Sequence, residues 1–244
     1  MMGVYKFISV VLVLTCFSLT CTLKAQQKPD PHINIPEGMI LVKGSRVKIG
    51  SDEGPENERP SFQTYVNSFL IDIKPINVAE FRLFVRINRY ITDAEKIGKA
   101  PVIDPESQSW KEVEGAYWEY PEGKHGRKAE NNEPVRQISW NDAQAYAKWV
   151  GKRLPSEYEL EFVSGQINKY PVIDLNGSLW HWCENWYAPY DDYNYYSKQL
   201  NRQKTLKGGA DLQSAGYPFR PSSRTSALPG SFSSMIGFRC AGDL

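Results

Sequence analysis

Helix start and stop signals predict that the helices of this 244-residue chain are short. Each signal is a capping pattern, in which a Ser or Asn is followed three residues later by an acidic residue that can bond back to the helix N-terminus. The three pairs are Asn77 with Glu80, Ser139 with Asp142, and Ser156 with Glu159. Gly151 and Gly165 are suitable ends for the second and third helices, and four prolines between residues 91 and 135 prevent a long element there. The fold must therefore combine short helices with strands and long loops.

Apolar spacing predicts the buried faces and some strands. The buried stripes of the first two helices are predicted to be Val78, Phe81, Phe84 and Val85, and Ala143, Tyr146, Ala147 and Val150. Residues 39–50 are typical of a hairpin that ends at Gly50, and residues 62–73 of a further strand. We predict one domain, residues 39–244, after a polar, proline-containing lead-in at residues 26–38.

Composition excludes some classes of function. The chain has 29 basic and 28 acidic residues, so it lacks the basic excess that a nucleic-acid-binding surface needs. Its hydrophobic content of 41% and charged content of 23% argue against disorder. Aromatic residues make up 13% of the chain, and this excess needs an explanation.

The first 25 residues have the pattern of a secretory signal peptide. Lys6 precedes an apolar run at residues 7–14 that is too short to span a membrane, and Ala25 is a small residue at the expected cleavage site. Cleavage there would export the protein to the periplasm or beyond the cell and leave 27 basic against 28 acidic residues. Attachment of a lipid at Cys21 is a less favoured alternative because Leu19 and Thr20 are not the residues that usually precede such a cysteine.

Two cysteines, Cys183 and Cys240, remain once the leader is removed. An oxidising compartment permits a disulfide between them. Two separate buried thiols are the favoured alternative, because their spacing along the chain proves nothing about proximity.

Catalytic motifs based on histidine, serine or phosphate loops are absent. No two of the three histidines have metal-ligand spacing, and the chain contains neither a Gly-x-Ser-x-Gly elbow nor a phosphate-binding loop. In the aromatic run at residues 177–187, a strand would place Trp180 and Trp182 on one face and His181 and Cys183 on the other. We favour core packing for this run over an aromatic-lined cleft. The tyrosine-rich tract at residues 187–196 fits a sugar or peptide contact as well as a plain surface loop.

Several blocks, in order, resemble the formylglycine-generating enzyme (sulfatase-modifying factor) family. They include residues 134–146, the run Gly151-Lys152-Arg153-Leu154-Pro155-Ser156-Glu157, residues 177–182, Lys207-Gly208-Gly209 and Ile236-Gly237-Phe238-Arg239-Cys240-Ala241. The resemblance covers nearly all of residues 38–242. It implies an α+β fold related to C-type lectins, with a single domain, short helices, small antiparallel sheets and long loops.

The chemistry of that family does not carry over as easily. In the family, two cysteines five positions apart bind copper and oxidise a substrate cysteine to formylglycine; here those positions hold Gln213 and Pro218, which cannot supply the thiolates that Cu(I) prefers. Family calcium-ligand positions correspond to Ser178 and His181, which lack a carboxylate. We therefore expect neither copper nor calcium as a cofactor. The candidate cleft residues that remain are Trp182, Tyr217, Arg220 and Arg224.

Three functional hypotheses follow. The leading one is an exported family member that has lost the copper oxidase activity and acts as a binding or assembly module for a protein or peptide partner. The second is a divergent metal-dependent oxidase with another centre, and the third is a component of the bacterial envelope or a secretion apparatus. The sequence leaves the ligand and the oligomeric state open.

Overall fold

Capping boxes begin three helices at the predicted residues. The computed structural model describes residues 34–104, 106–107, 109–175, 179–190, 202–209 and 219–244, which belong to one compact unit, Asn34–Leu244. Helices α1 (Val78–Asn88), α3 (Trp140–Trp149) and α4 (Glu157–Ser164) start after Asn77, Ser139 and Ser156, whose side chains accept the predicted backbone hydrogen bonds. A fourth helix, α2 (Asp93–Ile97), has a capping box at Thr92 that the sequence analysis missed.

Eleven short strands form four small sheets in the described part of the chain. The three-stranded sheet has the order β1 (Met39–Val42), β4 (Phe69–Asp72), β11 (Ala241–Gly242). The four-stranded sheet has the order β10 (Ile236–Gly237), β7 (Trp180–Trp186), β8 (Lys204–Lys207), β9 (Arg224–Ala227). Two-stranded pairs are β2 (Ser45–Ile49) with β3 (Phe62–Val66), and β5 (Lys99–Ile103) with β6 (Trp110–Glu114). These short helices and mostly antiparallel sheets make an α+β fold, with the β10–β7 pair parallel.

Three predictions of local structure were wrong. Residues 39–50 do not form a hairpin, because β1 pairs with β4 and β2 pairs with β3. Residues 62–73 form two strands rather than one. Val150, predicted to be buried, is the exposed C-cap residue of α3.

Aromatic rings fill the largest core. Phe81 of α1 packs against Trp118, Tyr146 and Phe238, with ring centroids 5.6 to 6.2 Å apart. Trp180 and Trp182 belong to the same core, whereas Cys183 belongs to a second core beneath β1–β4 and α4. As predicted, Trp180 and Trp182 lie on one face of β7 and Cys183 on the other. Core packing explains much of the aromatic excess.

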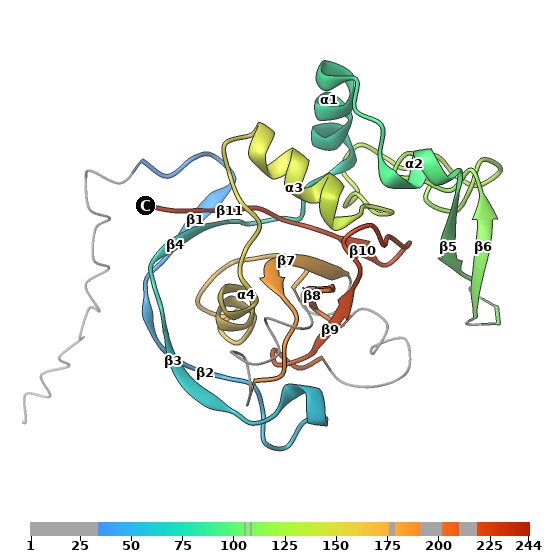
Figure 1. Cartoon of the computed structure of the whole chain (residues 1–244). Coiled ribbons are helices and arrows are strands. Elements are labelled where there is room, and N and C mark those ends of the chain that lie inside the picture. Colours follow the sequence, from blue (N-terminus) through green and yellow to red (C-terminus); the bar gives the residue numbers. More distant parts are fainter. Residues whose placement is uncertain (1–33, 105, 108, 176–178, 191–201, 210–218) are drawn as a thin grey trace, which may run out of the picture. The chain divides into compact units, whose positions relative to one another are not determined.

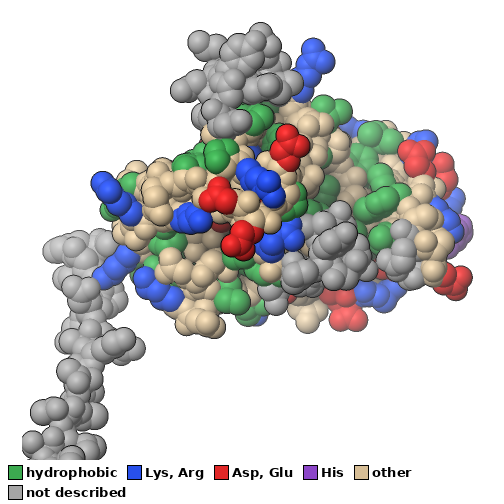
Figure 2. Space-filling view, turned by 90° about the horizontal axis from the view of Figure 1, so that it is seen from below, with side chains coloured by type: hydrophobic (Ala, Val, Ile, Leu, Met, Phe, Trp, Pro, Cys, Tyr) green, Lys and Arg blue, Asp and Glu red, His purple; other side chains and the backbone are tan. Residues whose placement is uncertain are grey.

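Figure 1 shows the strands β1–β4 and β2–β3 curving around α4, which contacts β2, β3, β7 and β8. The face seen in Figure 2 carries acidic and basic side chains next to one another rather than a field of one sign. Among the described residues, no helix has the length and apolar character that crossing a bilayer requires.

Candidate functional site: a buried charge network

Helix α4 carries two glutamates on its inward face. Glu157 and Glu161 are four residues apart, so one helical turn separates them and both side chains point the same way. Both are buried, although carboxylates are rarely buried without a partner. Glu159 points elsewhere and forms a bidentate ion pair with Arg153. The inward glutamates therefore require cations from other elements.

Lys207, the last residue of β8, supplies the cation for Glu161. Its Nζ lies 2.6 Å from Glu161 Oε2, and the side chains of the pair are 3% and 5% exposed. The other carboxylate oxygen accepts a hydrogen bond from the Gly50 backbone N–H at 2.6 Å. Lys207 Nζ also donates to the Ser222 carbonyl oxygen. This ion pair thus joins α4, β8 and Gly50, which follows β2, to the chain after residue 218.

Arg224, the first residue of β9, supplies the cation for Glu157. Its Nη2 lies 3.0 Å from Glu157 Oε2, and neither side chain is exposed. The guanidinium also stacks on the rings of Tyr187 and Tyr190, with distances of 4.4 and 3.9 Å to their centroids. Burial raises the pKa of Glu157, and the nearby Arg224 and Lys207 oppose that rise.

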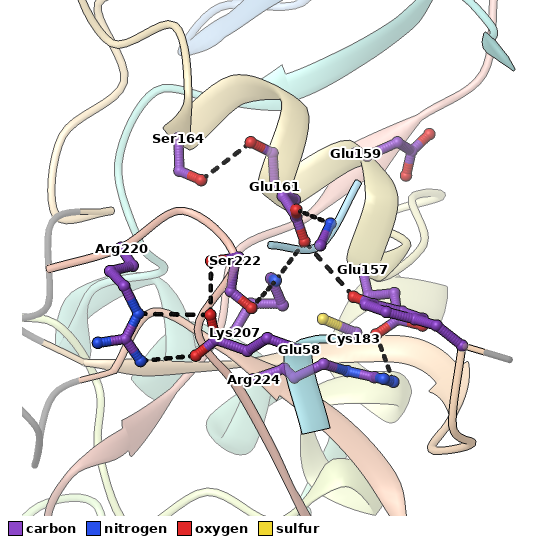
Figure 3. Close-up of polar contacts among 12 residues, drawn as sticks. Glu58, Glu157, Glu159, Glu161, Ser164, Cys183, Lys207, Arg220, Ser222 and Arg224 are labelled. Carbon is purple, nitrogen blue, oxygen red and sulfur yellow. Dashed lines mark hydrogen bonds and ion pairs between the residues drawn. The ribbon is translucent and has the colours of Figure 1, made fainter. Parts of the chain in front are cut away.

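A third pair completes the network. Glu58 of the short helix η1 (Glu56–Glu58) is buried and accepts two hydrogen bonds from Arg220, the shorter at 2.6 Å. The Ser222 hydroxyl donates to the same carboxylate at 2.6 Å. Figure 3 shows the three carboxylates and three cations converging from η1, α4, β8 and residues 220–224.

The network anchors both described flanks of residues 210–218. Lys207 precedes that segment, and Arg220, Ser222 and Arg224 follow it. Because each charge is paired, the network is suited to fixing the chain rather than to acting as a nucleophile or base. A cavity of about 460 Å³ lies beside it, and Glu161 and Ser222 form part of its wall. The remaining lining residues are Arg46, Val47, Lys48, Gly50, Phe162, Gly165, Gln166 and Pro221.

The predicted cleft residues differ in their burial and surroundings. Trp182 is fully buried, and its indole N–H donates to the Ile138 carbonyl oxygen at 2.8 Å, so it lies in the core rather than on a cleft. Arg224 is also buried, whereas Arg220 is partly exposed. Tyr217 lies outside the described residues, as do Gln213, Pro218 and Ser178.

Sequence reasoning missed Glu58, Glu157, Glu161 and Lys207. The spacing of Glu157 and Glu161 on one helical face was an available signal. The paired residues of the network are distant in sequence, however; Glu58 and Arg220, for example, are 162 residues apart.

The environment of His181 does not fit calcium. His181 is fully buried, and its Nε2 lies 2.8 Å from the Asp174 carbonyl oxygen. Burial, together with the nearby guanidinium of Arg239, lowers its pKa to about 3. Calcium requires hard oxygen ligands, whereas this site offers a neutral imidazole next to a positive charge. Within the described ranges, no group of three or more His, Cys, Asp or Glu residues could hold a metal ion.

Cys183 and Cys240 do not fit copper. Both are free, buried thiols, which agrees with the favoured prediction of two thiols rather than a disulfide. Burial raises the pKa of both well above the usual value, and Glu157 near Cys183 and Asp72 near Cys240 raise it further. Copper(I) needs accessible thiolates, and protonated thiols in two different cores do not provide them.

Comparison with known proteins identifies the family. The model of the sulfatase-modifying factor enzyme 1-like domain matches residues 24–167 and 163–244. The chain belongs to this family. The formylglycine-generating enzyme of Thermomonospora curvata is 28% identical, over 86% of this chain and 94% of that protein. The mouse protein named inactive C-alpha-formylglycine-generating enzyme 2 is 29% identical, over 94% of this chain and 92% of that protein.

Solved structures agree with the fold of this sulfatase-modifying factor domain. PvdO from Pseudomonas aeruginosa matches 84% of this chain and 94% of its own, with a TM-score of 0.59 and 16% identity. The crystal structure of CarF matches 86% of this chain and all of its own, with a TM-score of 0.53 and 14% identity. At these identities the likeness concerns the fold alone.

Proposed function

We propose that this chain is an exported sulfatase-modifying factor family member without copper-dependent formylglycine-generating activity, and that it acts as a binding or assembly module for a protein or peptide partner. The observation that carries the proposal is the state of its cysteines. Outside residues 1–25 the sequence contains only two cysteines, Cys183 and Cys240, and both are buried thiols. By the family resemblance, the copper-binding positions correspond to Gln213 and Pro218, neither of which can supply a thiolate.

The charge network supports a binding role. Three ion pairs tie η1, α4, β8 and residues 220–224 together on both described sides of residues 210–218. Paired charges fix Lys207, Arg220 and Arg224 themselves, and side chains that are already fixed lose less entropy when they contact a partner. The Thermomonospora curvata relative is named a formylglycine-generating enzyme, whereas the mouse relative is named an inactive one, which supports the proposal that a member of this family can lack the activity.

Titration with Cu(I) under reducing conditions, against a competing chelator, tests the loss of copper binding. The wild-type chain should compete no better than its Cys183→Ser/Cys240→Ser variant, and the Thermomonospora curvata enzyme should serve as the positive control. Tight, stoichiometric binding by the wild type would contradict the proposal.

Co-purification from the native source tests the binding role. The chain should be recovered with a reproducible protein partner in fixed ratio. Recovery as a lone monomer under gentle extraction would count against a binding or assembly module.

A further inference from the structure

Helix α1 has apolar side chains on the face that points away from the core. Its inward face consists of Val78, Phe81 and Phe84. Leu83 and Ile87, one turn apart, lie on the other face with 49% and 61% of their surfaces exposed. A surface helix normally carries polar residues there, so packing within this domain does not explain these two side chains.

Trp149 and Ile91 extend this exposed apolar surface. Trp149 is the last residue of α3, and its ring packs 5.5 Å from that of Phe84 while 37% of its surface stays exposed. Ile91, just beyond the end of α1, is 57% exposed. We call Leu83, Ile87, Ile91 and Trp149 the α1 patch. Helices α1 and α3 contact each other, and exposed apolar residues gathered on neighbouring elements mark interaction sites.

Three exposed cations accompany the patch. Arg86 and Arg89 lie at the end of α1, and Lys148 precedes Trp149. In the part of the chain that the structure describes, none of their side chains forms a hydrogen bond or an ion pair. By contrast, Arg82 on the inward side of α1 pairs with Glu119, and Glu80 accepts a hydrogen bond from the backbone of Asn77. Among the described residues, the three cations therefore lack counter-charges.

We propose that the α1 patch docks this domain on an anionic lipid surface. Leu83, Ile87 and Trp149 would enter the boundary between headgroups and acyl chains, and the three cations would contact lipid phosphates. Tryptophan is favoured at that depth because its ring is apolar and its N–H is polar. Figure 1 shows α1 at the edge of the domain, so its outer face is free to meet a flat surface.

A second copy of the chain fits this patch less well. Symmetric pairing would place the patch against itself and bring Arg86, Arg89 and Lys148 against the same cations of the other copy. The lipid proposal does not rest on the proposed function, because none of its residues belongs to the charge network or to the positions Gln213 and Pro218.

Vesicle binding tests the proposal with the compact unit Asn34–Leu244, which contains the whole core and lacks the apolar run at residues 7–14. It should bind vesicles of equal phosphatidylglycerol and phosphatidylcholine, but not vesicles of phosphatidylcholine alone. Leu83→Ser/Ile87→Ser should weaken binding about tenfold or more. Arg86→Gln/Arg89→Gln should weaken it about fivefold for each arginine and reduce its salt dependence.

Controls separate docking from loss of fold. Tyr65→Ser/Leu228→Ser removes two equally exposed apolar residues elsewhere and should leave vesicle binding unchanged. Near-ultraviolet circular dichroism of each variant should match the wild type. Brominated acyl chains should quench tryptophan fluorescence in the wild type and less in Trp149→Phe. The proposal would be overturned by equal binding to both kinds of vesicle or by unchanged binding of the Leu83/Ile87 variant. It would also be overturned if the wild type did not bind vesicles but formed a dimer that the Leu83/Ile87 variant could not form.

Discussion

The ion pair between Lys207 and Glu161 offers a quantitative test of the charge network. Replacing Lys207 with Met leaves the Glu161 carboxylate buried without its cation, a change that typically costs about 3–5 kcal/mol. Glu161 keeps the short hydrogen bond from the Gly50 N–H, so we expect the lower end, about 3 kcal/mol. At about 2–4 °C per kcal/mol for a domain of this size, the melting temperature should fall by about 6–12 °C.

A double-mutant cycle in urea, followed by tryptophan fluorescence, isolates the pair itself. Glu161→Gln/Lys207→Met retains an acceptor for Gly50 and removes both charges, so it should recover most of the loss and reveal a coupling of about 2 kcal/mol. Lys99→Met is the matched control, because Lys99 pairs with Glu112 on the surface and should cost less than about 1 kcal/mol. A loss below about 1 kcal/mol in Lys207→Met would refute the reasoning.

Further predictions concern titration, thiol reactivity and processing. Burial lowers the pKa of His181 from 6.5 to about 3, so as pH falls through that window the unfolded state binds a proton that the folded state does not. Stability should drop there by about 1.4 kcal/mol per pH unit from this group, and His181→Gln should remove that contribution in urea titrations at several pH values. Lys204 Nζ lies 4.1 and 3.8 Å from the ring centroids of Trp140 and Trp186, and burial lowers its pKa to about 8; a lysine NMR titration should find its midpoint well below 10.5. Cys183 and Cys240 should react with a thiol reagent only after unfolding, and fast reaction of the native protein would contradict their burial. Intact-mass analysis of the exported protein should find Gln26 at its N-terminus, whereas a lipid-modified Cys21 would show the alternative processing.

Local signals in the sequence were sufficient for the main helices. The capping boxes at Asn77, Ser139 and Ser156 act within one turn, so they identify helix starts without tertiary information. Strand pairing was not predictable in the same way, because β4 lies between β1 and β11, at opposite ends of the domain. The prolines between residues 91 and 135 argued against a long element, so the short elements α2, β5 and β6 were not predicted. Thr92 and Glu95 nevertheless form a capping box there.

The candidate site was only partly predictable. Arg220 and Arg224 were identified through the family resemblance, but their partners Glu58 and Glu157 come from η1 and α4. Only the tertiary fold shows that these charges are buried together. Trp182 was predicted to line the same cleft, whereas its ring packs in the aromatic core and its indole N–H donates to the Ile138 carbonyl oxygen.

Turnover of a substrate peptide tests the central claim most directly. A sulfatase-derived peptide with its target cysteine would be incubated with the copper-supplemented chain, oxygen and reductant, and formylglycine would be measured by mass spectrometry beside the Thermomonospora curvata enzyme. The account predicts conversion by that enzyme and none above the protein-free background for this chain. Catalytic conversion by the wild-type chain, retained in the Cys183→Ser/Cys240→Ser variant or lost with it, would contradict the claim.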